Sequence, residues 1–190
     1  EKIIKKSKYQ FEFVDLGGGM GISYDNSKKK LNLKKYSILI KKFLKKQKCQ
    51  IIFEPGRSII GNSGILISKV IYIKESSKKD FVILDVAMND FMRPALYNAI
   101  HKIIPVKKSV KKSKKNYEFV GPICESTDKF ALFKNFQKLK EKDLVIILDV
   151  GAYGMSLSSN YNLRPKATEL LIKNSKIKII SKRQKLKDLI

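Results

Sequence analysis

The sequence predicts an α/β unit followed by a mainly β region. Two observations carry this prediction. Residues 11–56 alternate between short apolar runs and one amphipathic run, whereas the chain beyond them consists mainly of strand-like apolar runs separated by polar turns. A strand–helix–strand order favours parallel strands, and short strands at close spacing are typical of a β domain. We expect the boundary between the two parts near residues 57–64.

The first element is the apolar run 11–16, which predicts a buried strand. It leads directly into three consecutive glycines, Gly17, Gly18 and Gly19. Because glycine has no Cβ, the backbone N–H groups of such a turn can converge on an anion. Taken alone, the glycines therefore fit either a structural turn or a phosphate-binding loop.

Two nucleoside-binding patterns also fit this stretch in part. Asp15 and the glycines at alternate positions after it match the D-x-G-x-G-x-G pattern of methyltransferases that bind S-adenosylmethionine, and the same stretch half-fits a dinucleotide fingerprint. Both patterns need an acidic residue about 20 positions further on to hold ribose hydroxyls. No Asp or Glu follows Asp25 until Glu54, so these interpretations lack their second anchor.

The next two elements complete the α/β unit. Residues 31–48 carry apolar side chains at helical spacing with lysines on the other face, which predicts an amphipathic helix, and residues 49–53 predict a second strand. Gly56 and Arg57 follow that strand. Because the carboxyl ends of parallel strands meet at one edge, we expect both residues beside the glycine loop, where they form a candidate phosphate pocket. The alternative is an ordinary Pro-Gly turn.

The mainly β region contains four further strand-like runs, a basic loop and two short helical candidates. The strand-like runs are residues 64–76, 80–90, 117–124 and 143–153. The lysine-rich residues 106–116 predict an exposed loop. We expect short helices within residues 127–137 and 164–174, and a last strand at residues 176–181.

The composition argues against several classes of function. The net charge of +24 comes from lysine doublets and triplets scattered over the chain, so we interpret it as a solvated coat and expect no nucleic-acid partner. Cys49 and Cys124 form neither a disulfide framework nor metal-ligand spacing, which suits a reducing cytoplasm, that of a plastid or endosymbiont included. We recognise no signal peptide and no membrane-spanning run. A single histidine, His101, cannot build a histidine-based metal site, so we expect chemistry from a cofactor and no metal.

Only four of the 41 basic residues are arginines, and an arginine supplies a planar, two-pronged donor that lysine cannot reproduce. Arg57, Arg93 and Arg164 lie in distinctive contexts and are therefore candidate site residues. Arg93 and Tyr97 are four positions apart and share a face if this segment is helical, where they could hold a carboxylate. The alternative is a packed tyrosine beside a surface arginine.

Two loops that follow strand-like runs carry further candidates. Cys124 and Glu125 lie in the loop 121–128, where a thiol tuned by its neighbour can act as a proton donor or nucleophile. A buried, inert cysteine is the alternative there. Tyr153 lies among small residues in the segment 149–162, which also suits a glycine-rich turn.

Taken in order, five motifs resemble those of the diaminopimelate decarboxylases, within the fold-type III family of amino-acid decarboxylases that depend on pyridoxal 5'-phosphate (PLP). The motifs are DLGGGMG, EPGRS, MNDFMRPALY, GPICESTD and DVGAYGMSLSSNYNLRP. This resemblance implies the C-terminal strands of an alanine-racemase-like (β/α)8 barrel at residues 1–58. It implies a mainly β C-terminal domain at residues 59–190, whose final segment can pack back on the barrel.

The resemblance also implies a PLP site. The residues implied to bind the cofactor are Gly17, Gly18, Gly19, Glu54, Gly56, Arg57 and Tyr153. The glycines and Arg57 would contact the phosphate, whereas Glu54 would lie near the pyridine nitrogen and keep the ring protonated. Such a ring is the electron sink that makes decarboxylation of an amino acid possible.

A small-molecule substrate and a second subunit are implied as well. The residues implied to bind the substrate are Arg57, Arg93, Tyr97 and Glu125, with Glu125 pairing with the distal ammonium group of diaminopimelate. Cys124 would act as the catalytic proton donor. In a head-to-tail homodimer, Cys124 and Glu125 would reach the active site of the partner subunit, and the product would be L-lysine.

One departure from the family qualifies this expectation. The Schiff-base lysine and the ring-stacking histidine of the family belong to an N-terminal half that nothing in this sequence matches. We therefore expect a fragment of a longer enzyme or the product of a truncated gene. In either case we expect the chain to be inactive by itself. The alternatives are a non-catalytic remnant that acts as a dimerisation or anion-binding module, and a sibling decarboxylase for ornithine, arginine or carboxynorspermidine. The sequences RPALY and CES disfavour the sibling enzymes.

Overall fold

The computed structural model describes residues 2–7, 9–24 and 31–190 of the chain. Its helices are α1 (Lys2–Lys6), α2 (Leu33–Leu44), α3 (Gly56–Ile60) and α4 (Arg93–Tyr97), with short 3-10 turns at Gly61–Ser63, Met155–Leu157, Tyr161–Leu163 and Leu186–Asp188. Its strands are β1 (Phe13–Asp15), β2 (Gln50–Ile52), β3 (Ile65–Lys74), β4 (Lys79–Leu84), β5 (Ile103–Pro105), β6 (Asn116–Val120), β7 (Lys129–Phe133), β8 (Leu144–Leu148), β9 (Glu169–Lys173) and β10 (Lys176–Ser181).

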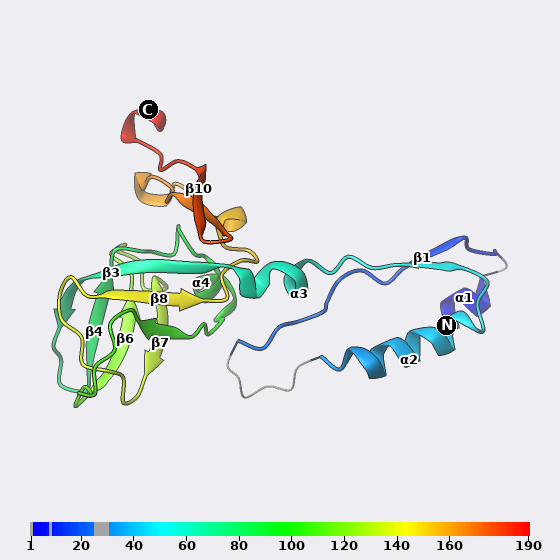
Figure 1. Cartoon of the computed structure of the whole chain (residues 1–190), viewed down its shortest axis with the longest axis horizontal. Coiled ribbons are helices and arrows are strands. Elements are labelled where there is room, and N and C mark those ends of the chain that lie inside the picture. Colours follow the sequence, from blue (N-terminus) through cyan, green and yellow to red (C-terminus); the bar gives the residue numbers. More distant parts are fainter. Residues whose placement is uncertain (1, 8, 25–30) are drawn as a thin grey trace.

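The predicted α/β unit is confirmed. Strands β1 and β2 pair in parallel with Phe13 opposite Gln50, and α2 lies between them in the chain. Asn32 caps this helix, because its side chain accepts a hydrogen bond of 2.9 Å from the backbone N–H of Lys35. No residue of α2 is buried, and Figure 1 shows β1, β2 and α2 extending away from the larger sheet.

The region after α3 is built on a six-stranded sheet with the strand order β5-β8-β3-β4-β6-β7. Only the β4–β6 pair of this sheet is parallel, and the other pairs are antiparallel. Alternate side chains of the central strands form the core, as expected for a sheet with one covered face. The core side chains with no exposed surface include Val82, Leu84, Phe119, Val145 and Ile147.

Both predictions of a short helix in the β region are wrong, because these segments contain strands. Residues 129–133 form β7, which pairs with β6 and packs Phe133 against Phe119 with ring centroids 5.7 Å apart. Burial of these aromatic side chains outweighs the weak local preference for helix.

The second segment expected to be helical, residues 164–174, contains strand β9 instead. This strand forms an antiparallel hairpin with the predicted last strand, β10. Asn174 and Ser175 connect the two strands with φ values of 50° and 60°. A two-residue connection with both φ values positive is the turn that matches the twist of paired strands, and asparagine tolerates it well. The turn therefore selects strands over a helix here.

Backbone contacts tie the turn after α3, residues 61–64, to the segment that follows β8. The N–H of Val150 donates to Gly64 over 3.0 Å, and the N–H of Gly151 donates to Gly61 over 3.1 Å. A Cβ at Gly151 would collide with the carbonyl oxygen of Ile60, so this close approach requires glycine. The connection brings the loop that carries Tyr153 beside the segment that carries Arg57.

Two further sequence expectations are confirmed. Residues 93–97 form the helical turn α4, and most of residues 106–116 are exposed in a lysine-rich loop. Among the described residues, no helix is both long and apolar enough to cross a membrane.

Candidate active site

The glycine loop and the turn after β2 are joined at the carboxyl ends of the two parallel strands. The N–H of Glu54 donates a hydrogen bond of 2.9 Å to the carbonyl of Gly17. The Gly17 N–H in turn donates to the Asp15 carboxylate over 2.7 Å. Gly17 and Gly19 have φ values of 65° and 74°, which favour glycine. The predicted adjacency of these two loops is therefore confirmed.

The glycines of these loops differ in how closely other atoms approach them. A Cβ at Gly18 would lie 2.5 Å from the carbonyl oxygen of Glu54, whereas a Cβ at Gly17, Gly19 or Gly56 would meet no atom within 4 Å. The glycines thus combine a close backbone approach with open space beside exposed backbone. That is the geometry in which backbone N–H groups bind an anion, so the residues present fit a phosphate group.

Tyr153 lies close to two of the sequence-predicted arginines. The guanidinium carbon of Arg57 lies 5.5 Å from the centre of the Tyr153 ring, and that of Arg93 lies 6.0 Å from it. Both are cation–π distances. Tyr153 has a φ of 59°, an uncommon conformation for a bulky residue and one that clusters at functional sites. The structure therefore brings together three residues from three separate motifs.

Arg93 is buried, and its Nη1 is fully used within the chain. This nitrogen donates to the Tyr24 hydroxyl over 2.6 Å and to Nε2 of His101 over 2.9 Å. The Arg93 guanidinium carbon also lies 4.7 Å from the centre of the Tyr24 ring. In contrast, the buried Nε of Arg93 has no hydrogen-bond partner, and the nearby Ser23 Oγ has none either.

His101 is a neutral imidazole in this environment. Its Nδ1 lies 2.9 Å from the carbonyl oxygen of Leu148, and a carbonyl can only accept, so Nδ1 carries the proton and Nε2 accepts from Arg93. Burial lowers the pKa of His101 from its ordinary value of 6.5, and the positive charge of Arg93 lowers it further, whereas the Leu148 contact and Asp149 oppose that shift.

Sequence reasoning missed both Tyr24 and His101 as site residues. Tyr24 lies outside the five motifs, and the lone His101 is weighed above only as a metal ligand. The one available signal was that His101 is a lone histidine eight positions after an arginine already singled out. Nothing in the sequence indicates that Tyr24, in the α/β unit, contacts α4.

The predicted pairing of Arg93 with Tyr97 is not seen as a direct contact. Arg93 is 5% exposed and points into the cluster just described, whereas Tyr97 at the end of the same helical turn is 62% exposed. Within the described residues, Tyr97 makes no side-chain hydrogen bond. The two side chains therefore stand in different environments although they share α4.

Cys124 and Glu125 lie together in a second location. Cys124 is exposed, and no hydrogen bond or ion pair among the described residues joins either one to the glycine loop or to the two arginines. Buried Asp128 holds their loop, since its carboxylate accepts from the N–H groups of Ile123 and Met88 over 2.9 and 2.7 Å. Desolvation by burial raises the pKa of Asp128 above its ordinary value of 3.8.

Arg164 links the Met88 segment to the C-terminal part of the chain. It donates to Asn89 Oδ1 over 3.0 Å and to the carbonyl of Asp85 over 2.6 Å, and it lies 3.6 Å from Asp90. Arg164 therefore has a structural role in this part of the chain. Burial nevertheless raises the pKa of Asp90 above 3.8.

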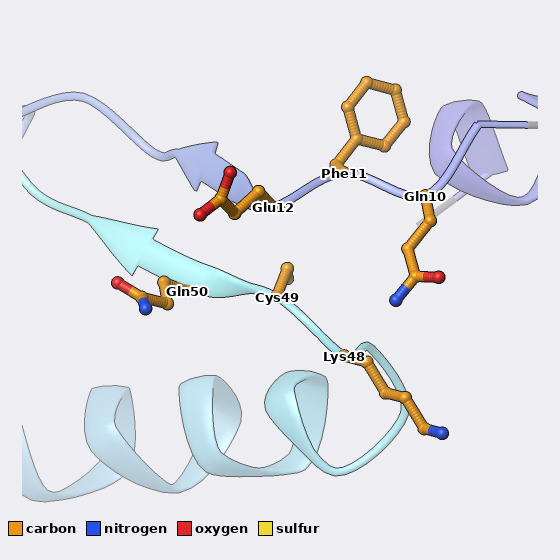
Figure 2. A pocket seen from close by; sticks show the side chains of 6 residues that line it. All are labelled: Gln10, Phe11, Glu12, Lys48, Cys49 and Gln50. Atoms are coloured by element: carbon orange, nitrogen blue, oxygen red, sulfur yellow. The ribbon is translucent and has the colours of Figure 1, made fainter.

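A hollow of about 610 Å³ lies elsewhere, at the amino ends of β1 and β2 (Figure 2). Its lining residues are Gln10, Phe11, Glu12, Lys48, Cys49 and Gln50. Sites in parallel α/β structures form at the carboxyl ends of strands, so this hollow is not the candidate site. A smaller hollow of about 360 Å³ includes Glu125 and Ser126 in its lining. The described part of the chain contains no group of three or more potential metal ligands.

Comparison with known proteins identifies the family. Residues 11–151 match the family described as pyridoxal-dependent decarboxylase, C-terminal sheet domain. This chain therefore belongs to the pyridoxal-dependent decarboxylases. Among the curated relatives, the diaminopimelate decarboxylase of Aquifex aeolicus is 43% identical over 93% of this chain, and that of Helicobacter pylori is 44% identical over 93%. The chain spans 42% and 44% of the lengths of these two relatives.

Solved structures agree with this assignment of fold. AQ1208 from Aquifex aeolicus covers 99% of this chain at 39% identity with a TM-score of 0.89, and the chain covers 46% of it. Diaminopimelate decarboxylase from H. pylori complexed with L-lysine covers 94% of the chain at 43% identity with a TM-score of 0.83, and the chain covers 43% of it. The predicted fold class, the end of an alanine-racemase-like barrel followed by a mainly β domain, is confirmed.

Proposed function

We propose that this chain supplies the C-terminal half of a PLP-dependent diaminopimelate decarboxylase, with residues 1–58 ending the barrel and residues 59–190 forming the β domain. The observation that carries the proposal is that Tyr153 lies within cation–π distance of both Arg57 and Arg93, while the Glu54 turn that precedes Arg57 is joined to the glycine loop. Relatives with this name match over almost the whole chain. The names of these relatives support diaminopimelate as the substrate, and the complex of the H. pylori enzyme with L-lysine supports L-lysine as the product.

The cofactor would be held by backbone and by three side chains. Gly17, Gly18 and Gly19, with Gly56, would surround the phosphate, which suits the open space beside these glycines. Arg57 would add positive charge, and Tyr153 would contact the cofactor. When bound, PLP supplies a protonated pyridine ring that accepts the electron pair left as the carboxylate departs as carbon dioxide. The Glu54 carboxylate would hold the proton at the ring nitrogen.

The substrate would be held at its two ends by residues that come from two different subunits. Arg57 and Arg93 supply cationic donors, and Arg93 has an unpaired Nε that is buried and therefore costly to leave without an acceptor. A substrate carboxylate would satisfy it. Tyr97 is exposed at the end of the same helical turn and would contact the substrate separately from Arg93, while Glu125 would pair with the distal ammonium group.

Cys124 would give a proton to the carbon from which the carboxylate leaves. Its thiol is exposed and lies apart from the arginines and glycines of its own chain. We therefore propose a homodimer in which Cys124 and Glu125 act in the partner's active site. Exposed apolar side chains on α2 and on the β9–β10 hairpin, such as Leu39 and Ile177, support burial against further protein surface.

The test uses the native protein from its source. It is reduced with borohydride in the presence of PLP, and its intact mass and any cofactor adduct are determined. A PLP adduct on a lysine outside residues 1–190, in a chain of roughly twice this mass, together with release of carbon dioxide from diaminopimelate, supports the proposal. A 21.8 kDa chain without a specific adduct would instead identify a non-catalytic remnant.

A further inference from the structure

Two residues, Tyr24 and His101, hold the guanidinium of Arg93, and the ligand that we assign to this guanidinium rests on the proposed function. We propose that Tyr24 and His101 are positioning residues that turn the Nε/Nη2 edge of Arg93 toward a substrate carboxylate. Neither residue would touch the substrate through its polar atoms. Both act through the arginine.

The donor count of the guanidinium supports this assignment. Arg93 has five N–H groups, two of them on Nη1. Tyr24 and His101 accept these two, at 2.6 and 2.9 Å. Nε has no partner, and both side-chain hydrogen bonds that Arg93 makes with described residues come from Nη1. The free donors therefore form the side-on edge of the guanidinium, whose two parallel N–H groups match the two oxygens of a carboxylate.

The imidazole of His101 can hold Arg93 in only one protonation state. Leu148 accepts the Nδ1 proton and Arg93 needs an acceptor at Nε2, so a proton on Nε2 breaks the contact and places two cations side by side. The groups facing His101 come from several elements: Arg93 of α4, the Tyr24 hydroxyl before α2, and Asp149 after β8. Phe91 packs edge-on against the imidazole at 4.7 Å.

The geometry makes Arg93 sensitive to the pH near the site. As long as His101 is neutral, Arg93 presents a fixed edge. Once His101 is protonated, the guanidinium loses one of its two anchors and gains a repulsive neighbour, so its carboxylate-binding edge is no longer held in place. Tyr24 provides the second anchor and also stacks on the guanidinium.

The first experiment uses the 190-residue chain and does not depend on decarboxylation. Since His101 is the only histidine, histidine labelled with ¹⁵N gives one imidazole in the NMR spectrum. We expect a proton on Nδ1 and none on Nε2. We also expect the Arg93 Nε–H signal, assigned with Arg93→Lys, to move on acidification with the same midpoint as the imidazole. A proton on Nε2 at neutral pH overturns the proposal. So does an Arg93 Nε–H signal that does not shift as His101 titrates.

The second experiment measures binding of a defined probe, L-lysine, through the same Arg93 signal. His101→Gln keeps an acceptor for Arg93, whereas His101→Leu removes it. We expect His101→Leu to weaken L-lysine binding about tenfold and His101→Gln to restore most of it, because hydrogen bonds to charged groups have this magnitude. Equal binding by His101→Leu and the unaltered chain overturns the proposal.

Tyr24→Phe tests the proposal even if a His101 variant fails to fold, because this substitution removes only a hydroxyl. It should weaken L-lysine binding several-fold, whereas Tyr72→Phe, which alters an exposed tyrosine on β3, should not. In the native enzyme, Tyr24→Phe should raise KM for diaminopimelate and leave kcat unchanged. Raised KM supports the proposal, and a lowered kcat at unchanged KM overturns it. If the NMR results hold and the native protein does not decarboxylate diaminopimelate, the proposed function fails while the positioning of Arg93 stands.

Discussion

The guanidinium carbon of Arg57 lies 5.5 Å from the centre of the Tyr153 ring, so the segment after β2 contacts the loop after β8 through a cation and an aromatic face. This contact connects the α/β unit to the larger sheet at the candidate site. It supplements the backbone hydrogen bonds that join the same two segments at Gly61 and Gly64.

Replacement of the Tyr153 ring should therefore weaken this connection. We expect Tyr153→Leu to be less stable than Tyr153→Phe by about 0.5–1 kcal/mol, the range of a cation–π contact at a partly exposed site. Both variants keep a Cβ at the left-handed φ, so backbone strain is common to them and the difference reports the ring. Urea unfolding followed by circular dichroism measures it, since the chain has no tryptophan. Equal midpoints would show that the contact contributes nothing.

Gly18→Ala should destabilise the glycine loop more than Gly21→Ala. A Cβ at Gly18 would lie 2.5 Å from the carbonyl oxygen of Glu54, whereas a Cβ at Gly21 meets nothing within 4 Å. Neither glycine has a positive φ, so the pair isolates the steric effect. We expect a cost of about 1–3 kcal/mol for Gly18→Ala, as for overpacking elsewhere. The comparison of urea midpoints tests this, and a larger loss in Gly21→Ala contradicts it.

The order of strands and glycines was predictable from the sequence because it depends on local patterns. The run before Gly17 and the run before Glu54 are short, apolar and separated by a helix, which leaves a parallel pair as the simple solution. The wrong prediction of a helix within residues 127–137 has the opposite cause. The apolar side chains of this segment suit either period, and only pairing with β6 selects the strand.

The cluster around Arg93 was only partly predictable for a similar reason. Motifs singled out Arg57, Arg93 and Tyr153 separately, but their proximity depends on the approach of Gly151 to Ile60. Tyr24 and His101 join the cluster only through tertiary contacts. A hydrogen bond between residues far apart in the chain leaves no periodic signal, so the sequence does not indicate that Tyr24 contacts Arg93.

Cys124→Ser should lower kcat for diaminopimelate decarboxylation by the native enzyme. A serine hydroxyl is a far weaker acid than a thiol, and general acid catalysis contributes typically 10²–10⁴-fold. Cys49→Ser is the matched control, because Cys49 lies at the amino end of β2 (Figure 2). Carbon dioxide release measures both variants. An unchanged kcat in Cys124→Ser would exclude the proposed proton donor.

Glu125→Gln should act mainly on KM for diaminopimelate. The substitution removes a charge that would pair with the distal ammonium group and keeps the shape of the side chain, so we expect KM to rise about tenfold, as for a lost charged hydrogen bond. Glu141→Gln alters an exposed glutamate between β7 and β8 and serves as control. Steady-state kinetics on the native enzyme separate KM from kcat. A normal KM in Glu125→Gln would remove this residue from the substrate site.

Asp128→Asn should destabilise the chain in a pH-dependent way. Each carboxylate oxygen of Asp128 accepts one backbone N–H, from Met88 and from Ile123. In the variant, one N–H would face an amide nitrogen, which leaves a buried donor unpaired at a cost of about 1–3 kcal/mol. The loop that carries Cys124 would then lose its anchor.

The sign of the pH effect follows from the raised pKa of Asp128. Because the folded chain holds this proton more tightly than the unfolded chain, the associated stability is fully present below pH 3.8 and is lost as the pH rises through the folded-state pKa. The free energy of unfolding of the unaltered chain, measured relative to Asp128→Asn, should therefore fall as the pH rises above 3.8. Urea titrations at a series of pH values measure this difference, in which the effects of the other carboxylates cancel. A difference that increases with pH over the same range would mean that the backbone N–H groups, rather than burial, determine the ionisation of Asp128.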